Sequence, residues 1–300
     1  MTTTQTPDRA PTWLNGCAHN VFSQFGEDGI IAAALKTIGT HDGWCVEFGA
    51  WDGIRHSNTR QLILNQGYAA VLIEGDAAKA RALTATYADN PKVIPRQAVG
   101  GFEAADGLDA LLAATPIPQE FDVLSIDIDG NDYHVWDAIA RYRPKLVLVE
   151  YNPTIPNPVR FVQPRDRRVA QGCSLLALVE LGRRKGYELV AATHTNGVFG
   201  DARFFPRFGI ADNSVPTLRT DESRITYIFN GYDGTVFMRG YGRVNWHRIP
   251  YRTARLQQVP RWLRGFGADY GPMKRWLARW YRAWVAGSAT APDAANDAPV

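Results

Sequence analysis

The chain has 300 residues, of which 45% are hydrophobic and 21% charged, a composition typical of a soluble globular protein with one large domain or two small ones. Its formal net charge of +3 is too small to indicate nucleic-acid binding. The three cysteines are too few and too widely spaced to predict a disulfide framework or a zinc site. With no signal-peptide pattern and no run of about 18 apolar residues, we expect a cytoplasmic protein without a membrane-spanning helix.

Short apolar runs alternate with helical patterns through the first half of the chain. After a polar tail expected to be disordered (residues 1–12), a helical pattern covers residues 23–38. Predicted strands lie within residues 44–48, 69–76, 92–100, 121–132 and 145–153. Helical patterns separate them at residues 54–67, 78–88, 104–114 and 134–143. This alternation predicts a mostly parallel sheet wrapped by helices.

The next segments complete the predicted domain. Residues 153–171 are rich in Pro and Arg without periodicity, so we expect either a lid or substrate loop or a plain surface excursion. A helix and a strand follow within residues 173–200, and residues 224–240 predict a hairpin that turns at residues 232–234. The expected fold over residues 13–244 is therefore a Rossmann-like, doubly wound α/β domain. Its sheet has seven mostly parallel strands, with the antiparallel hairpin at one edge.

The C-terminal extension, residues 245–286, interleaves tryptophan and tyrosine with arginine. A helical pattern at residues 274–285 has two interpretations. We expect its tryptophans to pack on the domain while the arginine stems point outward. Alternatively, residues 246–285 make peripheral contact with a partner or with an anionic membrane at its inner face. Residues 287–300 are expected to be a disordered tail.

Acidic residues stand where three of the predicted strands end. Glu47 ends the first, Glu74 the second, and Asp127 and Asp129 end the fourth. Ligands of open α/β sheets bind outside the carboxyl ends of the strands, so these acids are expected to share one crevice. Each could instead cap the following helix or lie solvated in a loop.

The turn after the first strand indicates the kind of ligand. Gly49 and Gly53 allow sharp bends, but Trp51 and the lack of G-x-G-x-x-G argue against a pyrophosphate. Glu74 stands where an acid binds the ribose hydroxyls of a nucleoside. A nucleoside without phosphates fits this pattern, such as S-adenosylmethionine, whose positive groups suit a carboxylate-lined mouth.

A family resemblance rests on four motifs in order: VEFGAWDG, IEGD, SIDIDGND and LVLVEYN. With SQFGEDGII upstream and SLLALVELGRRKGYELV downstream, residues 20–210 resemble class I S-adenosylmethionine-dependent methyltransferases, and most nearly the FkbM-like group. Asp129 stands where many relatives have Glu, and the C-terminal extension matches no pattern of the group. The resemblance implies these cofactor-binding residues: Glu47, Gly49, Ala50 and Gly53 at the methionine part, Asn58 beside them, Glu74 at the ribose, and Ala98 and Val99 near the adenine.

Oxygen ligands at the ends of the fourth and fifth strands point to the chemistry. Asp127, Glu150 and Asn152 are candidate ligands for Mg²⁺ or another divalent cation, as in metal-dependent O-methyltransferases. In a metal-free reaction, Asp129 or His134 would be the general base, and Asp127 is catalytic in either case. A structural alternative has Asp132 capping a helix and His134 on a helix surface.

The expected function is methyl transfer from S-adenosylmethionine to a hydroxyl group. The resemblance implies a small-molecule or glycan acceptor, such as a polysaccharide sugar or a secondary metabolite. One alternative is a metal-dependent nucleotide-sugar glycosyltransferase that uses D-x-D, although residues 47–53 would then have no role. A second alternative is a non-catalytic binding module on the same fold.

Overall fold

The computed structural model describes residues 10–288, which form two compact units divided between Glu222 and Ser223. Each unit is considered by itself. The two tails expected to be disordered, residues 1–12 and 287–300, lie almost entirely outside the described residues.

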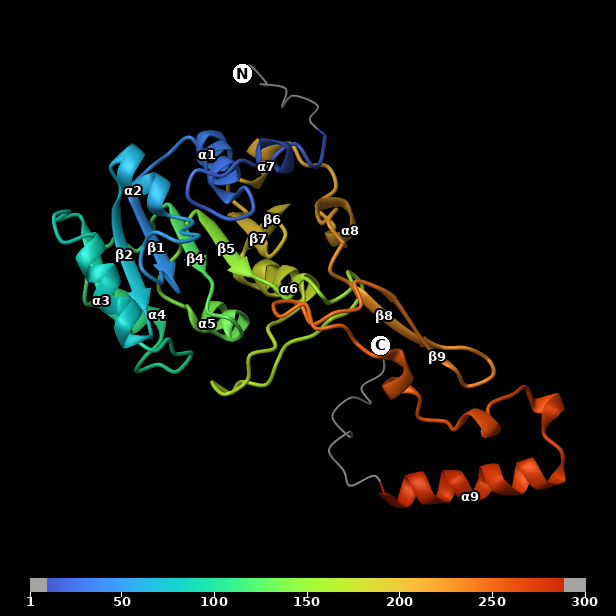
Figure 1. Cartoon of the computed structure of the whole chain (residues 1–300). Coiled ribbons are helices and arrows are strands. Elements are labelled where there is room, and N and C mark those ends of the chain that lie inside the picture. The colour runs from blue at the N-terminus through green and yellow to red at the C-terminus, as the bar shows by residue number, and fades with distance from the viewer. Residues whose placement is uncertain (1–9, 289–300) are drawn as a thin grey trace. The chain divides into compact units, whose positions relative to one another are not determined.

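The first unit contains a seven-stranded sheet in the order β3-β2-β1-β4-β5-β7-β6 (Figure 1). Its strands are β1 (Trp44–Phe48), β2 (Ala69–Glu74), β3 (Val93–Gln97), β4 (Val123–Ile126), β5 (Leu146–Glu150), β6 (Tyr187–Ala192) and β7 (Asn196–Asp201). The first five are parallel, while β7 runs antiparallel to both β5 and β6. The predicted Rossmann-like fold is confirmed.

Helices cover both faces of this sheet (Figure 1). They are α1 (Glu27–Ile38), α2 (Arg60–Gln66), α3 (Ala77–Thr86), α4 (Leu108–Ala113), α5 (Asp132–Ala138), α6 (Leu175–Lys185), α7 (Phe205–Phe208) and α8 (Val215–Leu218), after a short 3-10 turn, η1 (Asn15–Cys17). Neighbouring strand residues point to opposite faces, so Val46 packs with α4, α5 and α6 whereas Cys45 packs with α1, α2 and α3. Burial on both faces explains why the central strands are continuously apolar.

Two helices begin later than their patterns predict, because buried acids hold the preceding backbone in turns. Asp28 accepts the N–H groups of Val21, Phe22 and Ser23, so α1 starts at Glu27 and not at residue 23. Glu47 similarly engages the segment before α2, which starts at Arg60 and not at residue 54.

The antiparallel edge hairpin is β6–β7, and the expectation that residues 224–240 would supply it is wrong. Those residues form a separate two-stranded sheet, β8 (Thr226–Asn230) with β9 (Val236–Gly240). The β6–β7 hairpin escaped prediction because residues 193–195 carry no glycine or proline. The Asn196–Gly197 pair, a strong turn signal, lies inside β7.

The second unit joins the β8–β9 hairpin to the C-terminal segment. After β9 come the 3-10 turns η2 (Thr253–Leu256), η3 (Arg261–Leu263) and η4 (Gly267–Asp269), and then α9 (Pro272–Ser288). The Gln257 side chain bonds both the N–H and the carbonyl of Val236, at 3.1 and 2.8 Å. The hairpin is therefore tied to this unit. Across residues 10–288, no helix is both long and apolar enough to cross a membrane.

A buried ion pair supports the amino-terminal edge of the sheet. The Asp122 carboxylate accepts the N–H groups of Asp42 and Gly43 and lies 2.8 Å from Lys145 Nζ. Lys145 Nζ also lies 2.6 Å from Asp42 and donates to the Thr40 carbonyl. Asp122 is fully buried, so its charge depends on these partners.

We predict that Asp122→Asn lowers the free energy of unfolding by about 2–4 kcal/mol, because it removes a buried charge from its partners. Urea denaturation measures this loss. Asp166→Asn is the control, since Asp166 pairs with an Arg168 side chain that is 89% exposed. An equal loss in the two variants would contradict the assigned role of Asp122.

Candidate functional site

The site is centred where two turns meet, one after β1 and one after β4. Gly49 has φ +93°, and a Cβ at this position would lie 1.7 Å from the Asp127 carbonyl oxygen. The Asp127 N–H donates to the Phe48 carbonyl at 2.9 Å. Only glycine fits such a close approach. Because the strand order reverses between β1 and β4, this is the topological switch point at which open α/β sheets bind ligands.

Glu47 lies beneath the first turn and organises the loop that follows it. Its carboxylate accepts the hydroxyls of Ser57 (2.6 Å) and Thr59 (2.7 Å) and the N–H of Asn58 (2.7 Å). Burial raises the pKa of Glu47, and these hydrogen bonds offset part of that rise. The Asn58 amide in turn donates to Ser125 Oγ on β4. Glu47 and Asn58 were predicted to bind the cofactor. In the structure, the hydrogen bonds of their side chains hold this loop in place.

Four of the five N–H groups of the first turn, residues 49–53, are occupied within the chain. Those of Gly49 and Ala50 donate to the Ile73 carbonyl, Trp51 donates to Glu74, and Gly53 donates to the Ala50 carbonyl. A phosphate-binding turn needs free N–H groups directed at its ligand. The structure therefore agrees with the sequence argument against a pyrophosphate.

Ala50 and Gly53, two further predicted cofactor residues, serve packing. Ala50 is buried, and a Cβ at Gly53 would lie 2.5 Å from the Tyr87 ring. The Tyr87 hydroxyl also donates to the Gly53 carbonyl at 3.0 Å. These contacts fix the turn against the end of α3.

Glu74 and the two predicted adenine neighbours gather at the ends of β2 and β3. One carboxylate oxygen of Glu74 accepts the N–H of Trp51 at 2.9 Å, and the other accepts that of Asp76 at 2.8 Å. The Ala98 N–H donates to the Glu74 carbonyl, and Val99 is 63% exposed. The Trp51 ring is exposed in the turn, with Lys79 Nζ 3.9 Å from its centre. Sequence reasoning did not find this pair.

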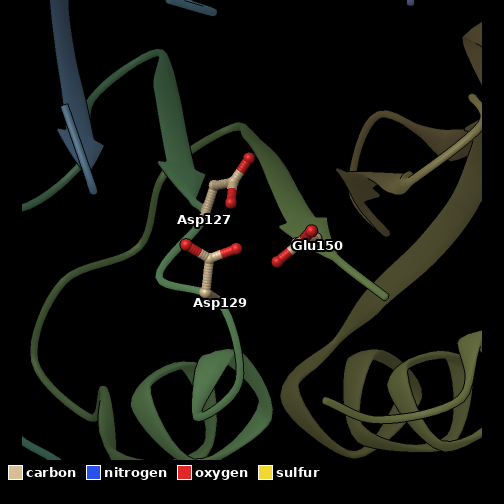
Figure 2. Close-up of side chains that lie close together, drawn as sticks. All are labelled: Asp127, Asp129 and Glu150. Atoms are coloured by element: carbon tan, nitrogen blue, oxygen red, sulfur yellow. The ribbon is translucent and has the colours of Figure 1, made fainter. Parts of the chain in front are cut away.

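Three carboxylates converge between the ends of β4 and β5 (Figure 2). Asp127, Asp129 and Glu150 each place an oxygen within 4.8 Å of the others. β4 ends at Ile126, so the two aspartates belong to the turn and not to one face of a strand, and Asp129 has φ +58°. Such an oxygen cluster can hold a hard divalent cation.

The pKa values of this cluster are raised. Burial, with further contributions from Asp132 and Asp129, raises the pKa of Asp127 to about 8. Burial and the nearby Asp127 raise the pKa of Glu150 well above its ordinary value. Neighbouring carboxyl groups with raised pKa values retain a proton at neutral pH, and a bound cation would displace it.

Asp132 shapes the turn that carries Asp129. Its carboxylate accepts the N–H groups of Ile128 and Gly130 at 2.8 and 2.9 Å. Burial raises the pKa of Asp132 to about 6, and the two hydrogen bonds act against the rise. The suggested alternative, in which Asp132 caps the helix, is not what the structure shows: Asp132 is the first residue of α5, and its carboxylate binds the turn that precedes the helix.

The Pro- and Arg-rich loop, residues 153–171, packs on the same turn. Gln163 folds the loop by accepting the N–H groups of Gln171 and Gly172 and by donating to the Val169 carbonyl. His134 Nε2 donates to the Gln163 carbonyl at 2.9 Å, and Asn131 donates to the Asp166 carbonyl. The predicted base His134 therefore holds the loop through this nitrogen.

Asn152, a predicted metal ligand, also shapes this loop. Its Oδ1 accepts the N–H and the hydroxyl of Thr154 at 2.9 and 2.7 Å, and its amide donates to the Gln171 carbonyl. With both lone pairs of Oδ1 engaged, Asn152 has little capacity to join the carboxylate cluster.

Arginines connect this loop to the segment between β3 and α4. Arg165 pairs with Glu103, Arg167 pairs with Asp106, and both guanidinium groups lie over the Phe102 ring. The sequence predicted either a lid or substrate loop or a plain surface excursion, and it did not predict these contacts, because ion pairs between distant loops leave no local pattern.

No protein-family model and no curated protein sequence matches this chain, so membership of the FkbM-like group remains a prediction. Among solved structures, the N-terminal domain of EvdMO1 with SAH bound is 15% identical over 58% of this chain and 80% of that one, with a TM-score of 0.38. An Aquifex aeolicus SAM-dependent methyltransferase is 11% identical over 63% and 97% (TM-score 0.36). Mitomycin 7-O-methyltransferase MmcR is 14% identical over 56% and 52% (TM-score 0.32). These distant similarities carry no argument about activity, which rests on the site itself.

We predict that replacing Asp127 with Asn changes how stability depends on pH. The native carboxyl titrates at about 8 and an unfolded one near 4. The folded protein thus binds more protons between these values, and its unfolding free energy falls as the pH rises through them. Asp127→Asn removes this loss of unfolding free energy at high pH.

Urea denaturation in the presence of a chelator should therefore show a relative gain in stability that is larger at pH 8 than at pH 5, by on the order of 1–3 kcal/mol. Asp137→Asn, on an exposed position of α5, is the control and should retain the native pH dependence. A gain of equal size at both pH values would contradict the raised pKa.

Proposed function

We propose that this protein is an S-adenosylmethionine-dependent methyltransferase that methylates a hydroxyl oxygen of a small-molecule or glycan acceptor. The observation that carries the proposal is the set of acids around the β1–β4 switch point, beside a turn in which four of the five N–H groups are occupied. Such a set of acids beside an occupied turn suits a nucleoside with positive groups and disfavours one with phosphates. The acceptor class rests on the family resemblance.

Glu74 is the proposed ribose ligand. Each of its carboxylate oxygens accepts one backbone N–H, which leaves each oxygen able to accept one more hydrogen bond. Two adjacent ribose hydroxyls match that capacity. Ala98 and Val99 at the end of β3 would border the adenine, and the turn at Gly49 would border the methionine part.

The carboxylate cluster is the proposed place of chemistry. The acceptor oxygen attacks the methyl carbon, the carbon–sulfur bond breaks, S-adenosylhomocysteine leaves, and the hydroxyl proton passes to a base. The raised pKa of Asp127, about 8, makes its carboxylate a stronger base than an ordinary one, and the fraction that can take this proton grows as the pH rises toward 8. A divalent cation bound by Asp127, Asp129 and Glu150 would lower the pKa of the acceptor hydroxyl.

Two rival functions share parts of this site. A nucleotide-sugar glycosyltransferase would use the carboxylate cluster to hold a cation and a diphosphate, but it gives no role to the occupied turn beside Glu74. A non-catalytic module would bind the nucleoside and leave the carboxylate cluster unused. Ligand-binding measurements distinguish a glycosyltransferase from the proposed methyltransferase. Turnover measurements distinguish a non-catalytic module from it.

We predict that Glu74→Gln weakens S-adenosylmethionine binding about 10- to 100-fold, because an amide nitrogen cannot accept the hydroxyl of the ribose. Calorimetry with S-adenosylmethionine, S-adenosylhomocysteine and a UDP-sugar measures this effect. Glu120→Gln, an exposed residue paired with Arg203, is the matched control. Binding of the UDP-sugar but of neither sulfur compound would overturn the proposed function.

We predict that Asp127→Asn lowers turnover by about 10²- to 10⁴-fold while cofactor affinity stays nearly unchanged, because the amide cannot take the proton or hold a cation. Transfer of labelled methyl to acceptors in a cell extract measures turnover, with Asp137→Asn as the control. If a chelator abolishes transfer and Mg²⁺ restores it, the cation is required. Undiminished turnover in Asp127→Asn would remove this residue from the chemistry.

A further inference from the structure

The small net charge of the chain conceals two units of opposite sign. Residues 1–222 contain 21 Lys and Arg against 26 Asp and Glu, whereas residues 223–300 contain 12 against 4. The first unit is therefore acidic and the second strongly basic. A charge separation of this kind concerns what a protein associates with and not how it folds.

Helix α9 concentrates this basic charge beside aromatic residues. Its 17 residues, PMKRWLARWYRAWVAGS, include four basic residues and no acid. Positions three or four apart share a helix face. Met273, Trp276, Trp280 and Trp284 therefore lie on one face. Arg275, Arg279 and Arg282 lie on another.

The aromatic face of α9 is open. Met273 is 75% exposed, and Trp276, Trp280 and Trp284 are 63%, 54% and 58% exposed. Trp280 and Trp284 stack at 6.5 Å between ring centres, which makes their surface continuous. The expectation that the tryptophans pack inward is thus not met within the second unit. Tryptophans exposed side by side indicate a binding surface.

Other parts of the second unit expose apolar side chains as well. Among the described residues, 14 of the 20 large hydrophobic side chains that are exposed belong to this unit, which makes up about a quarter of the chain. Tyr232 at the tip of the β8–β9 hairpin is 98% exposed, and Ile228 on β8 is 60% exposed. The apolar exposure and the positive charge therefore coincide in one unit.

We propose that α9 binds the surface of an anionic membrane. Tryptophan and tyrosine favour the boundary between lipid headgroups and acyl chains, and arginine binds lipid phosphates. The helix is about 25 Å long by its residue count, and its four charges prevent it from spanning the bilayer, so it lies along the surface. A nucleic acid would satisfy the arginines but would leave the tryptophan face largely exposed.

The helix is attached to its own unit by residues outside the aromatic face. Lys274 Nζ donates to the Arg264 carbonyl at 2.8 Å, and the Tyr281 hydroxyl donates to the Gln258 carbonyl. Substitutions of the three tryptophans or of Arg279 and Arg282 leave these contacts in place. They therefore test binding separately from folding.

The test is flotation of the full chain with vesicles of phosphatidylcholine alone or with about 30 mol% phosphatidylserine. We expect at least about tenfold stronger binding to the anionic vesicles, weakening with salt, and a blue shift of tryptophan fluorescence. Binding of equal strength to both vesicle types, or to neither, would overturn the proposal.

Two variants and a matched control sharpen the test. Trp276→Ser with Trp280→Ser and Trp284→Ser should lose the fluorescence shift and most of the binding. Arg279→Glu with Arg282→Glu should lose the preference for anionic lipid. Lys36→Glu with Arg141→Glu makes the same charge change at exposed positions of the first unit and should bind as the native chain does.

One outcome would assign the surface to a different occupant. If the native chain self-associates without vesicles, the tryptophan variant does not, and neither binds lipid, the face belongs to a second copy of the chain. That result also overturns the proposal.

Discussion

The contact between Gly49 and the backbone of Asp127 is the constraint on which the site depends. β1 and β4 are neighbours, and both must turn away at the same edge of the sheet, so one of the two turns has to pass without a side chain. Glu47 then fixes the loop from below, and Asp132 fixes the turn that carries Asp129. The positions of the carboxylates thus follow from backbone packing and not from contacts among the acids themselves.

The two edges of the sheet differ in whether their acids have a positively charged partner. At the amino-terminal edge, Asp122 has Lys145 as a counter-charge. At the opposite edge, no salt bridge reaches Asp127, Asp129 or Glu150 within residues 10–288. A charged carboxylate without a partner is costly to bury. The missing positive charge is what a proton, a cation or a positively charged ligand supplies, so the first edge stabilises the fold and the second has capacity left for binding.

Sequence reasoning succeeded where the determinant is local or where a general rule of sheets applies. The five parallel strands are apolar because they are buried on both faces, and acids at their ends share an edge by topology, which brought Asp127, Asp129 and Glu150 together. It failed where the hydrogen bonds of a side chain decide its role. The bonds of Asn152 within its loop and of Glu47 to residues 57–59 cannot be read from either residue alone. The β6–β7 hairpin was missed because its turn lacks glycine and proline.

The position of the β6–β7 hairpin has a consequence for how the first unit folds. The buried Glu27 at the start of α1 accepts hydrogen bonds from Thr193 and Asn196, which lie 166 and 169 positions later in the chain. During synthesis, almost the entire unit must therefore be made before the buried acid of the first helix can form these hydrogen bonds. Contacts of such separation slow folding and couple the two ends of a domain. The sheet is thereby expected to form as one cooperative body, with its last hairpin completing the environment of its first helix.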